Sequence, residues 1–109
     1  MEMLSPIEKT VLEGEIVEAL RTVFDPEIPV NVYDLGLIYG IDIDYDGSVG
    51  IRMTLTSPGC PVAGILPGEV EEKAASVPGV SEAHVELVWD PTWTMDMMTD
   101  EAKLDLGLF

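Results

Sequence analysis

The stretch "LGLIYGIDIDYDGSVGIRMTL", from Leu35 to Leu55, determines the architecture of the chain. Its apolar residues recur at every second position, which is the period of a β-strand with one buried face. Asp46-Gly47 at its centre is a strong signal for a tight hairpin turn. The stretch therefore predicts two antiparallel strands that bury one face. The residues predicted on that face are Leu35, Leu37, Tyr39, Ile41, Ile43, Val49, Ile51, Met53 and Leu55.

A helix is predicted before the hairpin, because apolar residues recur there at steps of three and four. Two starts are open, one capped by Ser5 and one capped by Thr10. The Asp25-Pro26 pair is expected to end the helix, since a residue that precedes proline avoids the helical region. The predicted apolar stripe consists of Val11, Leu12, Ile16, Leu20, Val23 and Phe24.

A second helix is predicted from about Pro61 to Val77, followed by a third strand. Pro67 inside this helix predicts a kink or a short first segment, because proline lacks the N–H of the helical hydrogen bond. The predicted buried stripe of the helix is Ile65, Val70, Ala74 and Val77. In the strand, Val80, Val85, Leu87 and Trp89 are predicted on one face, and His84, Glu86 and Val88 on the other.

The element order helix, strand, strand, helix, strand predicts a small α/β (α+β) fold in a single domain, residues 1–109. Two helices on one face of a three-stranded mixed sheet bury all these stripes. The third strand follows a helical crossover and should run parallel to one strand of the hairpin. Residues 90–109 form an irregular to helical C-terminal tail, in which Thr99 is placed to start a last helical turn.

The charge of the chain restricts its partners. It carries 21 acids against five Lys and Arg, a formal net charge of −16. Such a chain repels phosphate backbones and anionic membranes, so we expect no nucleic-acid and no membrane partner. The longest apolar runs are too short to span a bilayer, and no signal peptide is visible. With one cysteine there is no internal disulfide, which favours the cytoplasm.

The single cysteine, Cys60, lies between Gly59 and Pro61 at the junction of the second strand and the second helix. Proline prefers the first helical position, which makes Cys60 the expected N-cap or its neighbour. Unpaired N–H groups at a helix start lower a thiol pKa and favour the reactive thiolate. Gly59 leaves the sulfur unshielded. The alternative is a buried, inert cysteine, because free cysteines are often buried.

A complete catalytic or metal site is not apparent around Cys60. A cysteine nucleophile needs a base, and the only histidine, His84, is predicted in mid-strand with its side chain toward solvent. A closed metal site takes about four ligands, and no paired cysteine or histidine spacing is present. One thiolate can still contribute a ligand to a transient iron ion or iron–sulfur cluster that a second chain completes.

Polar residues near the junction are candidates to line a pocket around the cysteine. Asp25, Glu27 and Asp34 lie in the loop before the hairpin, where they can also serve as helix stops and turn formers. Thr54 and Thr56 share the strand face that leads to Cys60. We therefore predict Asp25, Glu27, Asp34, Thr54, Thr56 and Gly59 as pocket residues.

Four blocks of the chain resemble a known family: "DPEIPVNVYDLGLIY", "MTLTSPGCP", "VPGV" and "VELVWDPTW". Their order and spacing are similar to those of the small domain family that includes SufT and PaaD, domain of unknown function fifty-nine. The resemblance extends from about Glu15 to Phe109. It implies that Asp25, Glu27, Asp34, Thr54 and Cys60 are the family's motif residues, with Cys60 as the reactive or ligating thiol. Thr92 stands where many members have proline.

The resemblance implies an accessory or carrier factor in iron–sulfur cluster assembly, with no permanent cofactor. Its partners would be iron–sulfur assembly proteins and client apo-proteins, and a homo-oligomer stays open. One alternative is an adaptor without metal chemistry that docks clients through Trp89, Trp93 and the methionine-rich tail. Others are an accessory protein of a phenylacetate-type oxygenase system and, least supported, an enzyme with a cysteine nucleophile.

Overall fold

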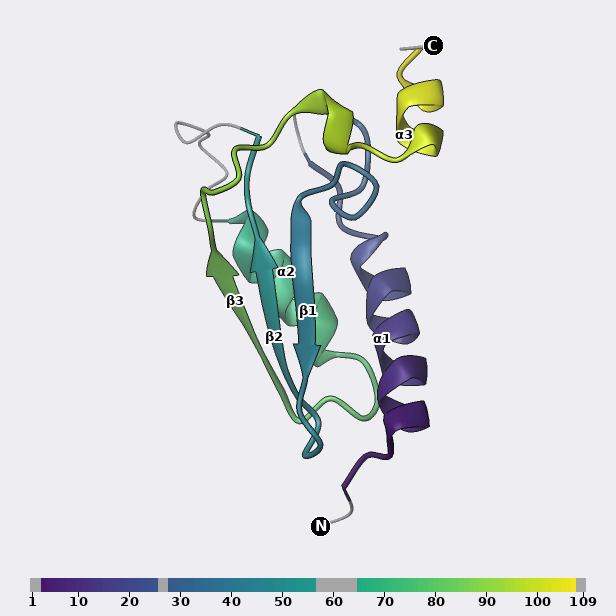
Figure 1. Ribbon diagram of the computed structural model, residues 1–109, viewed down its shortest axis with the longest axis vertical. Helices are drawn as coiled ribbons and strands as arrows, with labels where there is room; N and C mark the ends of the chain where they lie inside the picture. The colour runs from purple at the N-terminus through teal and green to yellow at the C-terminus, as the bar shows by residue number, and fades with distance from the viewer. Residues whose placement is uncertain (1–2, 26–27, 57–64, 108–109) are drawn as a thin grey trace.

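The hairpin is the centre of the fold. The computed structural model describes residues 3–25, 28–56 and 65–107. Strands β1 (Ile38–Ile43) and β2 (Ser48–Met53) pair antiparallel, with Ile41 opposite Ile51 (Figure 1). Gly47 forms the turn with φ +88°, a conformation that favours glycine. The predicted strand start was too early, because Leu37 N–H donates to the Val32 carbonyl and not to β2.

Helix α1 (Pro6–Leu20) starts at the first of the two predicted caps. The Ser5 hydroxyl accepts from Glu8 N–H, and the Glu8 carboxylate accepts from Ser5 N–H. The helix ends at Leu20, before the predicted Asp25-Pro26 stop. Thr22 bonds back to the Ala19 carbonyl through both its N–H and its hydroxyl, and this turn replaces a further helical step.

The predicted stripe of α1 is only partly buried. Leu12, Ile16, Leu20 and Val23 lie in the core, as predicted. Val11 and Phe24 are 57% and 55% exposed, so their assignment to the buried stripe was wrong. Val11 lies on the solvent side of α1, and Phe24 lies beyond the end of the helix, where the helical period no longer applies.

Helix α2 (Leu66–Ala75) begins later than Pro61. Pro67 lies in its first turn, where its missing N–H has no helical partner to lose, so no kink arises there. Residue Ile65 is the N-cap and is 60% exposed, which corrects its placement on the buried stripe. Val70 and Ala74 are fully buried, as predicted. Residues 61–64 lie outside the described part of the chain.

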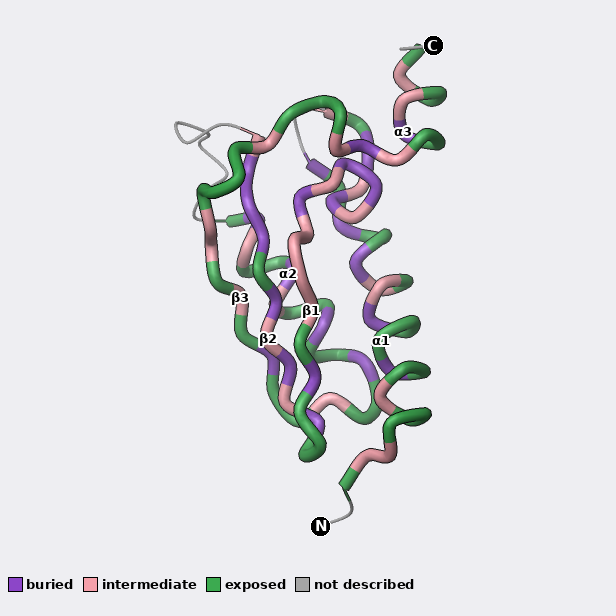
Figure 2. The backbone as a smooth tube through the Cα atoms, viewed as in Figure 1, coloured by how far each residue is buried: buried purple, intermediate pink, exposed green. Residues whose placement is uncertain are grey.

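Strand β3 (Glu82–Leu87) runs parallel to β2 and completes a sheet of order β1-β2-β3. Helices α1 and α2 contact each other and cover one face of this mixed sheet (Figure 1). The core lies between the helices and the sheet, where the buried residues of β2 are Val49, Ile51 and Met53 (Figure 2). The predicted fold class, with two helices on one face, is confirmed.

The C-terminal segment crosses the end of the sheet and finishes in a short helix (Figure 1). It contains a 3-10 turn, η2 (Met95–Met97), and helix α3 (Asp100–Asp105). Thr99 caps α3, since its hydroxyl accepts from Ala102 N–H at 3.2 Å. The predicted last helical turn is therefore present. Across the described ranges, no helix combines the length and the apolar character needed to span a membrane.

Candidate functional site

The loop before β1 and the end of β2 lie at the same end of the sheet (Figure 1). This follows from the antiparallel hairpin, in which the start of one strand adjoins the end of the other. Thr54 N–H donates to the Leu37 carbonyl at 2.8 Å and joins the two segments. The residues with the predicted thiol, 57–64, follow Thr56 in the chain and lie outside the described residues.

Three of the predicted pocket residues are buried polar side chains in a mostly apolar interior. Asp25, Asp34 and Thr54 are 3%, 7% and 1% exposed, and they are all the buried polar or charged residues in the described ranges. Thr56, three residues beyond the end of β2, is half-buried. Burying polar groups is costly unless they are hydrogen-bonded, so the partners of these side chains decide how this end of the sheet is stabilised.

Asp25 organises the turn that precedes the hairpin. Its carboxylate oxygen Oδ1 accepts from Ile28 N–H at 3.1 Å, and its own N–H donates to the Val30 carbonyl at 3.2 Å. A bridge between Phe24 and Asn31 holds the two sides of this turn together. The turn-forming role that the sequence allowed for Asp25 is thus present.

Of the two carboxylate oxygens of Asp34, one accepts a hydrogen bond from a described residue and the other accepts none. Its Oδ2 accepts from the Asn31 amide at 2.8 Å, and its N–H donates to Asn31 Oδ1 at 2.9 Å. Its other oxygen, Oδ1, is buried without a hydrogen-bond partner among the described residues. The Arg21 Nε lies 3.7 Å from Oδ1, which is an ion-pair distance and too long for a hydrogen bond. Within the described ranges, Asp34 Oδ1 therefore has an ion-pair partner but accepts no hydrogen bond.

Arg21 supplies the positive charge beside this carboxylate. It also forms an ion pair with Glu18 at 3.1 Å and lies 5.3 Å from the centre of the Tyr33 ring. Arg21 is the C-cap residue of α1, so the end of the helix positions its side chain. Sequence reasoning did not identify Arg21 or Asn31 as parts of the site. Asn31 is the chain's only asparagine, which was the available signal.

The C-terminal segment holds the loop that contains Asp34. Trp93 Nε1 donates to the Leu35 carbonyl at 2.7 Å, and Thr99 N–H donates to the Asp34 carbonyl at 2.9 Å. Gly36, with φ +82°, lies directly against the backbone of Met97, where a Cβ atom would collide with it. The backbone around Asp34 is therefore fixed by residues distant in the sequence.

Tyr39 forms a further contact between the hairpin and this segment. Its hydroxyl donates to the Pro91 carbonyl at 2.8 Å and lies 3.4 Å from Met97 Sδ. Burial raises the pKa of Tyr39 above its ordinary value, and the negative charge of Asp90 raises it further. The phenol therefore stays a neutral hydrogen-bond donor at physiological pH.

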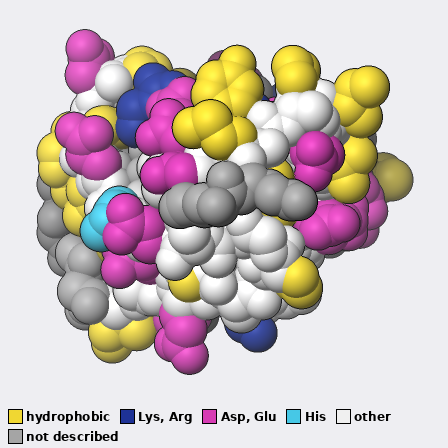
Figure 3. Space-filling model, turned by 90° about the horizontal axis from the view of Figure 1, so that it is seen from below, with side chains coloured by type: hydrophobic (Ala, Val, Ile, Leu, Met, Phe, Trp, Pro, Cys, Tyr) yellow, Lys and Arg dark blue, Asp and Glu magenta, His cyan; other side chains and the backbone are white. Residues whose placement is uncertain are grey.

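His84 is not a buried catalytic group. It lies on β3 opposite Gly50 and is exposed, with Nε2 3.7 Å from Glu82 (Figure 3). This is the solvent-facing position that the sequence predicted. Within the described ranges, no three His, Cys, Asp or Glu side chains gather as metal ligands. Glu27, Gly59 and Cys60 belong to the predicted site but lie outside those ranges.

The large apolar residues of the C-terminal segment are divided between the core and the surface. Met98 is 5% exposed and Trp93 packs against the core, whereas Trp89 and Met95 are 44% and 51% exposed. Leu104 on α3 is 66% exposed. The C-terminal segment therefore contributes to the core and also, among its described residues, leaves three large apolar side chains exposed.

Comparison with known proteins identifies the family. The chain is 54% identical to the Fe-S protein maturation auxiliary factor of Porphyromonas gingivalis, over 87% of this chain and 90% of that protein. It is 46% identical to the Fe-S protein maturation auxiliary factor YitW of Bacillus subtilis, over 89% and 95%. A solved Bacillus anthracis structure, a domain of unknown function, has a TM-score of 0.85 and 37% identity, over 92% of this chain and 95% of its own.

The region matched by the family profile covers the second half of α1, the hairpin, α2 and β3, and with them every residue of the predicted site. The family profile described as "Iron-sulfur cluster assembly protein" matches residues 13–87. The chain belongs to this family of iron–sulfur cluster assembly proteins.

Proposed function

We propose that this protein is an auxiliary factor in the maturation of iron–sulfur proteins, and that Cys60 transiently binds iron or a cluster as cargo. Two relatives, at 54% and 46% identity, are named Fe-S protein maturation auxiliary factors, and the similarity extends over almost their whole length. Cys60 is the chain's only thiol. Because a cluster is normally held by four protein ligands, a single thiolate suits transfer better than storage.

The observation that carries this proposal is the half-bonded carboxylate of Asp34. Among the described residues, its Oδ1 has an ion pair with Arg21 at 3.7 Å but no hydrogen bond, and leaving a buried acceptor without a hydrogen bond costs about 1–3 kcal/mol. Such a group is rarely kept for stability alone. It lies at the end of the sheet from which the chain continues to Cys60. We infer that Asp34 and Thr54 serve the chemistry of the cysteine.

The partners in this proposal are the assembly proteins that supply the cargo and the client apo-proteins that accept it. The remaining ligands of the cargo would come from these partners or from a second copy of the chain. The cytoplasm is the proposed compartment, because the thiol must stay reduced. In this proposal the chain acts as an accessory factor.

Complementation tests the proposal. A Bacillus subtilis strain without YitW is supplied with this protein, and the activity of an iron–sulfur-dependent dehydratase is measured in extracts. We expect the unmodified protein and a Ser57→Ala control to restore activity, and Cys60→Ser to fail at equal protein level. Full restoration by Cys60→Ser would remove the thiol from the mechanism. Failure of the unmodified protein, seen as folded in the extract, would remove the proposed function.

A further inference from the structure

The two edge strands of the sheet differ in how their outward backbone groups are covered. The order β1-β2-β3 leaves β1 and β3 as edge strands. On β3, the outward N–H of Val85 donates to Glu71 Oε2 of α2 at 3.1 Å, so an acidic side chain covers that edge. Covering an edge in this way prevents pairing with other chains. Just beyond the end of β1, Leu4 N–H donates to the Tyr45 carbonyl at 2.7 Å, but in the described part of the chain nothing equivalent covers the central residues of the β1 edge.

The pairing register shows which backbone groups of β1 are unpaired. Asp44 N–H donates to the Ser48 carbonyl at 2.9 Å, and Asp42 lies opposite Gly50. Since backbone groups alternate along a strand, Asp42 and Asp44 point toward β2, whereas Ile41 and Ile43 point away from it. Within the described residues, no hydrogen bond reaches these outward groups of Ile41 and Ile43.

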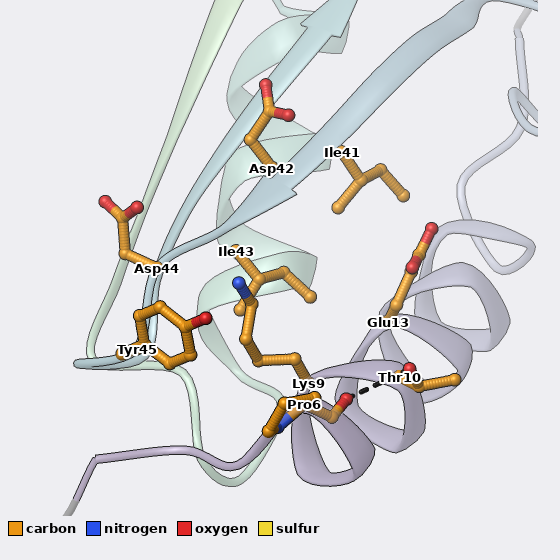
Figure 4. Close-up of a pocket in the computed structure, with 9 residues that line it drawn as sticks. All are labelled: Pro6, Lys9, Thr10, Glu13, Ile41, Asp42, Ile43, Asp44 and Tyr45. Carbon is orange, nitrogen blue, oxygen red and sulfur yellow. Dashed lines mark hydrogen bonds between the residues drawn. The ribbon is translucent and has the colours of Figure 1, made fainter.

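The outward edge of β1 opens into a groove along α1. A cavity of about 450 Å³ separates the strand from the helix (Figure 4). The side chains of Lys9 and Glu13 extend from α1 along one wall, and Ile41 and Ile43 lie on the strand side (Figure 4). A smaller cavity of about 130 Å³ shares Glu13 and Ile41 and continues the groove toward the start of β1.

The groove is acidic. Glu13 lies on its helical wall, and Asp42 and Asp44 are exposed on its strand side. The Arg52 Nε lies 3.7 Å from Asp42 Oδ2, and because both side chains are exposed this ion pair is weak and open to exchange with another cation. Lys9, the cation that lines this groove among the described residues, is placed over the Tyr45 ring, 4.2 Å from its centre. The net charge of −16 strengthens this local field. A guest with positive charge therefore fits the groove, and a guest with negative charge does not.

We propose that the β1 edge binds an extended segment of a partner protein in which basic and apolar residues alternate. The segment would add a fourth strand, with up to four hydrogen bonds to the N–H and C=O groups of Ile41 and Ile43. Its apolar side chains would share the face of Ile41 and Ile43. Its basic side chains would share the face of Asp42 and Asp44, where opposite charges on neighbouring strands attract.

A second copy of the chain is a poorer guest. The protein has five Lys and Arg against 21 acids, so no segment of it alternates basic and apolar residues. Two β1 edges placed side by side would bring Asp42 and Asp44 of both chains together, and like charges on paired strands are destabilising. This surface goes beyond the proposed cysteine chemistry and does not depend on it.

Titration with a defined peptide tests the proposal. The probe is a short acetylated and amidated peptide in which lysine and valine alternate, added to the ¹⁵N-labelled protein. With the peptide at about ten times its Kd, hydrogen exchange at Ile41 and Ile43 should slow about tenfold, because exchange then occurs from the free fraction. Exchange at Val85, on the covered edge, should be unchanged.

Three controls separate strand addition from charge attraction. The same peptide, N-methylated at the amides that would face β1, should bind at least about tenfold more weakly, since it lacks those donors. Asp42→Lys should weaken binding, whereas Glu86→Lys, with the same charge change on β3, should have a smaller effect. Equal binding of the methylated peptide, no binding at all, or dimerisation through β1 would each overturn the proposal.

Discussion

Trp93 Nε1 donates a hydrogen bond to the backbone carbonyl of Leu35 across 58 positions of sequence. The bond length is 2.7 Å, and the carbonyl belongs to the residue next to Asp34. The C-terminal segment is therefore part of the candidate site, because it fixes the backbone that orients the half-bonded carboxylate. Its contribution can be measured without touching Cys60.

Trp93→Phe removes this hydrogen bond and keeps an aromatic ring in place. We expect the lost hydrogen bond to lower the free energy of unfolding by about 1 kcal/mol. The smaller phenylalanine ring should lower it further, because it packs less apolar surface. Urea unfolding followed by circular dichroism measures the change. Trp89→Phe is the control, since Trp89 is exposed and its replacement should change stability little. Equal effects of the two variants would contradict a structural role for the Trp93 bond.

Gly36→Ala should destabilise the protein strongly. Gly36 has φ +82° and lies against the Met97 backbone, so an added methyl group forces η2 away from the loop. Gly14→Ala is the matched control, because Gly14 lies in α1 with open space around it. That control should stabilise the protein by about 0.5–1 kcal/mol. Thermal unfolding of the two variants should therefore shift in opposite directions.

Tyr39 should make the free energy of unfolding depend on pH in the alkaline range. Its folded-state pKa is raised by burial and by Asp90, so the folded protein retains the phenol proton more strongly than the unfolded chain. Its contribution is fully present below the unfolded pKa of about 10 and is lost as the pH rises through the folded value. Urea midpoints should fall above about pH 10. The Tyr39→Phe variant should lack the part of this decrease in urea midpoint that comes from the phenol.

Asp34→Asn separates the chemical role of the carboxylate from its structural role. The amide oxygen can still accept from Asn31, and the lost attraction to the partly exposed Arg21 is worth less than about 1 kcal/mol. We expect a folded protein with reduced complementing activity in the strain without YitW. Activity equal to the unmodified protein would show that the carboxylate has no chemical part.

The local part of the fold was predictable from the sequence. Period-two alternation and Asp46-Gly47 placed the hairpin, and Ser5 marked one of two possible starts for α1, because these signals lie within a few residues of the structure they determine. The end of α1 at Leu20 was not predicted. It depends on Thr22, whose hydroxyl competes for a helical carbonyl. The late start of α2 follows from the position of Pro67.

The polar part of the site was predictable as a set of residues but not as a network. Asp25, Asp34 and Thr54 stood out through the family resemblance, and all three are buried. The partners of Asp34 could not be predicted, because Arg21 approaches it from the end of α1 and Thr99 from the C-terminal segment. Such contacts arise from tertiary packing and have no local period.

Anaerobic reconstitution tests the central claim most directly. The protein and Cys60→Ser are each incubated with ferrous iron, sulfide and a thiol reductant, desalted, and mixed with a client apo-protein whose activity requires a cluster. We predict that the unmodified protein carries iron and acid-labile sulfide and activates the client. Cys60→Ser should carry neither and leave the client inactive. Equal loading and equal client activation by the two proteins would contradict the account.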